Sequence, residues 1–169
     1  MNIQDILKEN THGMLFGLIA ALIVFYIKKV QDPQVLFIIS LISIIAGVII
    51  TYKLKIPRGF FTEQAVLIIG GLIILISFFG IQLDIFSVSP TTIWGKLTKF
   101  LFGKVIGVTL FAGLLSTFNI FFGIIALIIG LIILGIPMAG LIKAITDNLT
   151  LIIIVIGISS VFGYMIRKK

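Results

Sequence analysis

Hydrophobic residues in this chain gather in long, nearly uninterrupted blocks separated by short polar connections. In a water-soluble core, apolar positions recur instead at short helical or strand spacing. A helix needs about 20 predominantly apolar residues to cross the hydrocarbon core of a bilayer, and most of the blocks approach that length. The pattern therefore predicts an all-α fold, a polytopic transmembrane helical bundle with about six spans.

The predicted spans lie at residues 13–27, 35–52, 65–83, 97–118, 120–142 and 149–166. The first block runs into Lys28 and Lys29, where a cleaved signal peptide would have small residues, so we expect a retained span. Pro33 follows in the next connection and marks the end of one helix and the start of another. Because every polar connection is short, residues 1–169 are expected to form a single integral membrane domain.

The stretch from Phe100 to Ile142 has only one charged residue, Lys104, and as a helix it would be about 65 Å long, roughly twice the thickness of a bilayer core. The chain must therefore turn back within it. The polar cluster of Ser116, Thr117 and Asn119 is the predicted reversal, and Pro137 is expected to kink the fifth span. One crossing plus a re-entrant segment remains the alternative to two full spans.

Residues 90–102 have the pattern of an amphipathic helix lying in the membrane interface. Ser89 and Pro90 are typical of a helix start. One face then carries Ile93, Trp94, Leu97, Phe100 and Leu101, and the other carries Thr92, Lys96 and Lys99. We expect this interfacial helix to bend into the fourth span.

Composition agrees with a membrane protein and excludes several kinds of chemistry. Hydrophobic residues make up 60% and charged residues 11% of the chain, with a mean hydropathy of +1.31, whereas soluble proteins have about 25% charged residues. The absence of cysteine excludes thiolate metal sites and disulfides, and a single histidine, His12, excludes multi-histidine sites within this chain. All six acidic residues fall in tails, loops or span ends. We therefore expect no cofactor, no metal site and no catalytic residues.

The net charge of +7 comes from lysines and arginines grouped at the ends of apolar blocks. Such residues anchor spans to lipid headgroups, so the predicted partner is the lipid bilayer and not nucleic acid. With six spans, the side holding both termini would carry seven basic residues and the other side six. We expect a multi-pass protein of the cell membrane with a cytoplasmic N-terminus. The re-entrant alternative would divide the charges eight to five and place the N-terminus outside.

Two groups of residues are candidates for a site. Lys104 lies inside an apolar stretch, and Asp84 at the end of span three is the acid best placed to share its interface, so the two could form an intramembrane ion pair or contact a substrate. A lysine that reaches lipid phosphates is the simpler interpretation. The break at Ser116, Thr117 and Asn119 could line a polar path or form a tight turn.

Pairs of small residues four positions apart recur along the spans, including Gly13 with Gly17 and Ser43 with Gly47, and favour close helix packing. We found no GxSxG elbow, no phosphate-binding loop and no acidic cluster for Mg²⁺. The expected function is therefore non-enzymatic: a small multi-pass subunit or scaffold of a larger membrane assembly, whose partners are other membrane subunits or further copies of this chain. A small homo-oligomeric transporter or channel is the alternative.

Overall fold

The computed structural model describes residues 2–30, 32–57, 64–66, 68–70, 72 and 104–167. Within these ranges the chain is 89% helical and has no strand. The helices are α1 (Ile3–Glu9), α2 (His12–Lys28), α3 (Pro33–Leu54), α6 (Lys104–Phe118), α7 (Ile120–Leu134), α8 (Met138–Asp147) and α9 (Leu149–Arg167). The predicted all-α fold class is thus confirmed for the described part of the chain.

Helix boundaries in the first half follow local chemistry. Asp32 caps the start of α3 by accepting a hydrogen bond of 2.8 Å from the backbone N–H of Gln34, and Pro33 occupies the first turn, where its missing N–H costs nothing. Helices α2 and α3 both end in a lysine with left-handed backbone, Lys29 at φ 52° and Lys55 at φ 49°. A left-handed residue turns the chain away from the helix axis and lets following N–H groups cap the last carbonyls.

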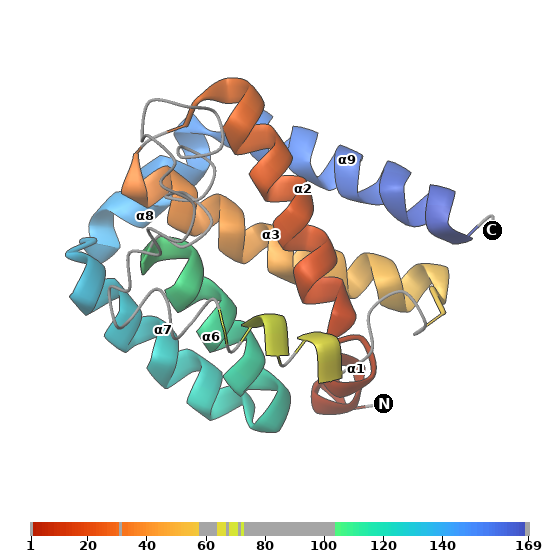
Figure 1. Cartoon of the computed structure of the whole chain (residues 1–169). Coiled ribbons are helices and arrows are strands. Elements are labelled where there is room, and N and C mark those ends of the chain that lie inside the picture. Colours follow the sequence, from red (N-terminus) through yellow and green to blue (C-terminus); the bar gives the residue numbers. More distant parts are fainter. Residues whose placement is uncertain are drawn as a thin grey trace, which may run out of the picture.

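Helix α3 lies at the centre of the bundle and packs against α1, α2, α6, α8 and α9 (Figure 1). Helix α2 runs antiparallel to α3, because Gly13 meets Gly47 and Thr51, while Val24 and Phe25 pack near the start of α3. Helices α6 and α9 run parallel to α3. This direction follows from two sets of contacts: those of α6 run from Val108 with Phe37 to Gly113 with Ile44, and those of α9 run from Ile152 with Val35 to Gly163 with Leu54.

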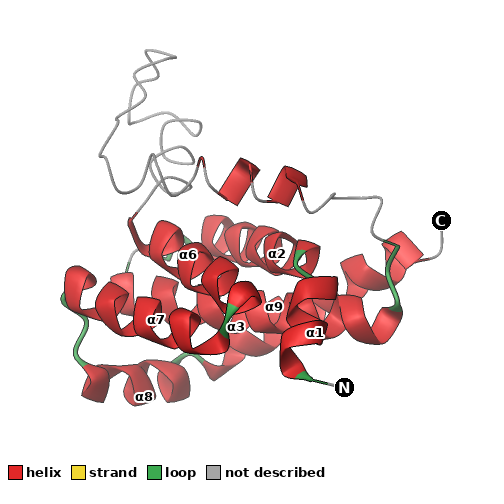
Figure 2. Cartoon of the chain, turned by 90° about the horizontal axis from the view of Figure 1, so that it is seen from below, coloured by secondary structure: helices red, strands yellow, loops and turns green. Residues whose placement is uncertain are grey.

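The bundle therefore has two distinct ends. The α1 end holds α1, the start of α2 and the last turns of α3, α6 and α9, and the α8 end holds α8, Lys29 and the starts of α3 and α9. Gln4 of α1 donates a 3.1 Å hydrogen bond to the carbonyl of Thr117, which ties the last turn of α6 to the α1 end. At the other end, Gly140 of α8 lies against the side chain of Gln34. Figure 2 shows α1 and α8 apart, with the chain termini both on the right.

Apolar side chains fill the contacts between these helices in several clusters. Ala21, Val24 and Phe25 of α2 join residues of α3 and α9. Leu15 and Leu18 of the same helix pack instead with α6 and Val66. A third cluster joins α3, α6, α7 and α8. Helices α2 and α3 thus form the shared layer on which α1, α6, α8 and α9 pack, and α7 packs on α6.

Two of the described helices, α3 and α9, are long and apolar enough to cross a membrane, and there are up to four such spans if each of two bent helix pairs is counted as one. The bent pairs are α1 with α2, at 72°, and α7 with α8, at 92°. These apolar helices suggest a membrane protein. The predicted spans at 35–52 and 149–166 correspond to α3 and α9, and the one at 13–27 corresponds to α2, which is 17 residues long.

The structure differs from the sequence interpretation at residues 120–142. A single span with a kink at Pro137 is predicted there, but α7 ends at Leu134 and α8 begins at Met138. Gly135 has left-handed backbone at φ 65°, and the N–H groups of Gly135 and Ile136 bond to the carbonyls of Ile132 and Leu131, which terminates α7. Pro137 then favours an extended conformation and precedes a new helix that turns by 92°.

Parts of the sequence interpretation lie outside the described residues. They include the interfacial helix at 90–102, most of the span at 65–83 and the beginning of the span at 97–118, whose described part starts at Lys104.

Candidate functional site

The predicted pair of Lys104 and Asp84 is described only in part. Lys104 is the first described residue of α6, at the α8 end of the bundle, and its side chain is not among those the structure describes. Asp84 lies outside the described residues. The structure therefore leaves the ion pair and the headgroup contact as alternatives for Lys104.

The polar cluster at residues 116–119 forms the turn between α6 and α7. The hydroxyls of Ser116 and Thr117 donate to the carbonyls of Gly113 and Leu114 in their own helix, at 2.5 and 2.6 Å. Asn119 caps α7 by accepting a 2.9 Å hydrogen bond from the N–H of Phe121. These polar groups are therefore engaged in ending one helix and starting the next.

Helices α2 and α3 cross at glycines, and polar side chains continue the contact toward the α1 end. A Cβ added at Gly17 would overlap the backbone of Ser43, and one added at Gly13 would lie 2.6 Å from the carbonyl oxygen of Gly47. The hydroxyl of Thr51, beside Gly13, is fully buried and donates to the carbonyls of Gly47 and Val48. The small residues singled out in the sequence are thus brought face to face in this crossing.

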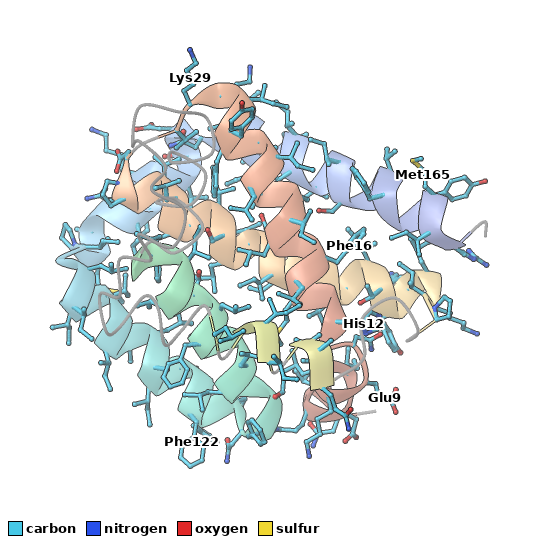
Figure 3. All side chains as sticks on the ribbon, in the orientation of Figure 1. Glu9, His12, Phe16, Lys29, Phe122 and Met165 are labelled. Atoms are coloured by element: carbon cyan, nitrogen blue, oxygen red, sulfur yellow. The ribbon has the colours of Figure 1, made fainter. Side chains whose placement is uncertain are left out.

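A hollow of about 430 Å³ opens at the α1 end, beyond the glycine crossing. Its lining comes from two segments: Glu9 and Asn10 at the junction of α1 and α2, and Tyr52, Lys53, Lys55 and Ile56 at the end of α3. Glu9 and His12 lie at this end of α2, and Lys29 lies at its other end (Figure 3). We refer to this cavity as the α3-end hollow.

Asn10 and Ile56 form the buried part of the α3-end hollow, at 8% and 7% exposure, whereas Glu9, Lys53 and Lys55 are exposed. The side-chain amide of Asn10 donates a 2.9 Å hydrogen bond to the carbonyl of Ile6 and so holds the α1–α2 junction in place. Within the described part of the chain, the ammonium groups of Lys53 and Lys55 and the carboxylate of Glu9 form no hydrogen bond or ion pair. The lining thus carries two positive charges and one negative charge.

The sequence interpretation missed this hollow. The only trace of the hollow in the sequence pattern is the basic pair Lys53 and Lys55, which directly follows an apolar block. Such a pair is typical of a membrane anchor. Nothing in the sequence pattern places Glu9 and Asn10 beside that pair, because the two segments meet only through the α2–α3 crossing.

No group of three or more His, Asp or Glu residues in the described ranges is arranged to hold a metal ion. His12 is buried at 5% exposure at the start of α2. The arrangement of the described residues therefore offers packing surfaces between helices and a hollow lined by charged side chains. Comparisons with protein-family models, with curated proteins and with solved structures found no match to this chain.

Proposed function

We propose that this protein is a non-enzymatic, multi-pass subunit or scaffold of a larger membrane assembly. The observation that carries the proposal is the contrast between α3 and α9. Of the most apolar window of each helix, 61% is buried inside the structure for α3 but only 22% for α9. A long apolar helix that its own described chain covers so little has a large surface left for lipid or for a partner helix.

The exposed side of α9 has features that favour a helix partner over lipid. Gly157 is exposed, and a Cβ added there would meet nothing within 4 Å. Ser160, one turn further on, is also exposed and donates a 2.8 Å hydrogen bond to the carbonyl of Ile156. Small residues on neighbouring turns of one helix face leave a notch in the surface, and such a notch lets a second helix approach closely.

The helix directions support six crossings. Helix α3 ends at the α1 end, and the parallel helix α6 begins at the α8 end, so the connection between them has to return from one end to the other. We assign that return to the predicted span at 65–83. Val66 packs with Leu15 and Leu114 near the α1 end, where such a span would begin. Both termini would then lie on one side, which we propose is the cytoplasmic side of the cell membrane.

Orientation is testable by cysteine labelling, since the chain has no cysteine of its own. Lys8→Cys marks the α1 end and Lys29→Cys the α8 end. In intact cells, a membrane-impermeant maleimide is expected to label Lys29→Cys, and Lys8→Cys only after permeabilisation. The opposite pattern would invert the proposed orientation, and labelling of both from outside would contradict a crossing at α2.

The subunit role is tested by gentle extraction of the tagged protein, native mass measurement and identification of co-purified polypeptides. Stoichiometric recovery of other membrane polypeptides would support the proposal. We expect Gly157→Leu to release them, because a Cβ at this position meets nothing within 4 Å among the described residues and the larger side chain fills the notch on α9. Ile132→Phe, which adds volume to the exposed face of α7, is the matched control. Recovery of a lone monomer would refute the proposal.

Recovery of a homo-oligomer alone would instead favour the small transporter or channel. Reconstituted flux would then be compared between the wild type and Lys104→Met, with Lys104→Arg as the charge-preserving control. Flux lost in Lys104→Met but kept in Lys104→Arg would assign Lys104 to the transport path.

A further inference from the structure

We propose that the α3-end hollow binds a phosphate group, either that of an anionic lipid headgroup or free phosphate. This inference is independent of the subunit role, because it concerns the end of the bundle and not the exposed face of α9. The volume of the hollow, about 430 Å³, lies within the range of small-ligand sites. A phosphate with its attached ester group fits that space.

The charges of the hollow favour an anion. Lys53 and Lys55 each bring an ammonium group that has no partner in the described part of the chain, and one carboxylate, Glu9, opposes them. An ammonium group is a common phosphate ligand in proteins. Within the described part of the chain, the two lysines are therefore available to a phosphate without breaking an existing interaction.

The backbone at the end of α3 supports the same conclusion. A helix C-terminus is normally unfavourable for an anion, because its last carbonyls point outward. Here the N–H of Lys55 bonds to the carbonyl of Tyr52 at 3.3 Å, and the N–H of Ile56 bonds to that of Thr51 at 3.2 Å. Two of the carbonyls that would repel a phosphate are thus capped within the chain.

The position of the hollow along α3 favours a phosphate at the level of the lipid headgroups. Helix α3 is apolar over most of its 22 residues, and the hollow opens where that helix ends. Tyr52, at 37% exposure, lies in its wall, at the level where aromatic side chains commonly meet lipid headgroups. The apolar floor provided by Ile56 would face the glycerol part of a lipid.

The chain contains an internal control for this site. Helix α2 also ends in two lysines: Lys28 lies in its last turn, as Lys53 does in α3, and Lys29 has the same left-handed backbone as Lys55. All four lysines are exposed, but only Lys53 and Lys55 line the hollow. If these lysines only anchor the helices to lipid headgroups, replacing either pair should weaken lipid binding equally. If the hollow binds phosphate, only the replacement of Lys53 and Lys55 should weaken it.

The test compares Lys53→Gln/Lys55→Gly with Lys28→Gln/Lys29→Gly. Glycine adopts left-handed backbone without strain, so both double variants keep the helix ends, and each loses two lysine charges and one side chain beyond Cα. The melting temperature of each double variant should equal that of the wild type or lie slightly above it. The readout is native mass spectrometry of protein from phosphatidylglycerol and from phosphatidylcholine nanodiscs, with and without added inorganic phosphate.

We expect the wild type to retain one phosphatidylglycerol and to retain phosphatidylcholine less. The Lys53→Gln/Lys55→Gly variant should bind phosphatidylglycerol at least about tenfold more weakly, and the Lys28→Gln/Lys29→Gly variant should bind it unchanged. Glu9→Gln removes the opposing charge and should strengthen binding a few-fold. Bound inorganic phosphate that displaces the lipid, with the same variant dependence, would identify free phosphate as the ligand.

Two outcomes would overturn the proposal. Equal weakening in both double variants would show a general effect of surface charge. Equal retention of phosphatidylglycerol and phosphatidylcholine, with no binding of inorganic phosphate, would show that the hollow does not recognise a phosphate anion.

Discussion

Replacing Gly17 by alanine tests the crossing of α2 and α3 directly. The new Cβ would lie 2.6 Å from the carbonyl carbon of Ser43 and closer still to its oxygen. Non-bonded carbon atoms normally approach to about 3.5 Å, so the two helices have to separate by at least about 1 Å. Because the clashing atoms of Ser43 belong to the backbone, the added methyl group cannot be accommodated by a side-chain movement alone.

The size of the effect follows from that separation. A gap of about 1 Å forfeits roughly a third of the dispersion energy of the affected atom pairs. If those contacts equal the ones made by a single buried leucine, the loss is about 2.5 kcal/mol. Alanine recovers about 0.7 kcal/mol through its higher helix propensity. The net loss of about 2 kcal/mol should lower the melting temperature by about 4–8 °C in a protein of this size.

Thermal unfolding of the purified protein in one fixed detergent measures this shift, and Gly157→Ala is the control. Gly157 also lies within a helix of the bundle, but its added Cβ meets nothing within 4 Å. That variant should be neutral or slightly stabilised. If Gly17→Ala and Gly157→Ala change the melting temperature by the same amount, the close approach of α2 and α3 at Gly17 is refuted.

Three further variants test single interactions. Ser159→Ala should raise the melting temperature by about 2–4 °C, since the Ser159 hydroxyl is fully buried and has no hydrogen-bond partner in the described part of the chain. Asn119→Ala removes the cap of α7 and should cost about 1 kcal/mol, measured by the same thermal unfolding. Gln4→Ala breaks the bond to the Thr117 carbonyl, and hydrogen exchange should rise in α1 with little change in α3.

The sequence is a good guide to where helices form in this chain and a weaker guide to where they end. Long apolar runs predict α3 and α9 well, because few other structures satisfy such a run in a membrane. Pro33 and Asn119 mark helix starts in the expected way. These signals are local, so no knowledge of the packing is needed to interpret them.

The break between α7 and α8 shows what the local signals leave out. Pro137 was expected to kink one continuous helix, but Gly135 ends α7 before the proline is reached. The amphipathic segment after it, with Lys143 and Asp147, was interpreted as the end of a span and a loop. Glycine and proline two positions apart form a stronger stop signal together than proline does alone, because one terminates the helix and the other prevents its continuation.

The α3-end hollow could not be predicted, because its two walls belong to different segments. Glu9 and Asn10 precede α2, and Lys53 and Lys55 end α3. Only the antiparallel packing of α2 on α3 brings these ends together. Residue types alone show two lysines and an acid, with no indication of a shared cavity.

The packing of α2 on α3 should therefore affect how well the α3-end hollow binds phosphate. The glycine crossing at Gly13 and Gly47 lies directly beside Thr51, one residue before the first residue of α3 that lines the hollow. The closeness of that crossing determines how near the lysines of α3 come to the α1–α2 junction. A substitution that separates the helices, such as Gly17→Ala, should therefore widen the hollow and weaken phosphate binding without removing any charge. A substitution at Gly157 lies outside this contact and should leave binding unchanged.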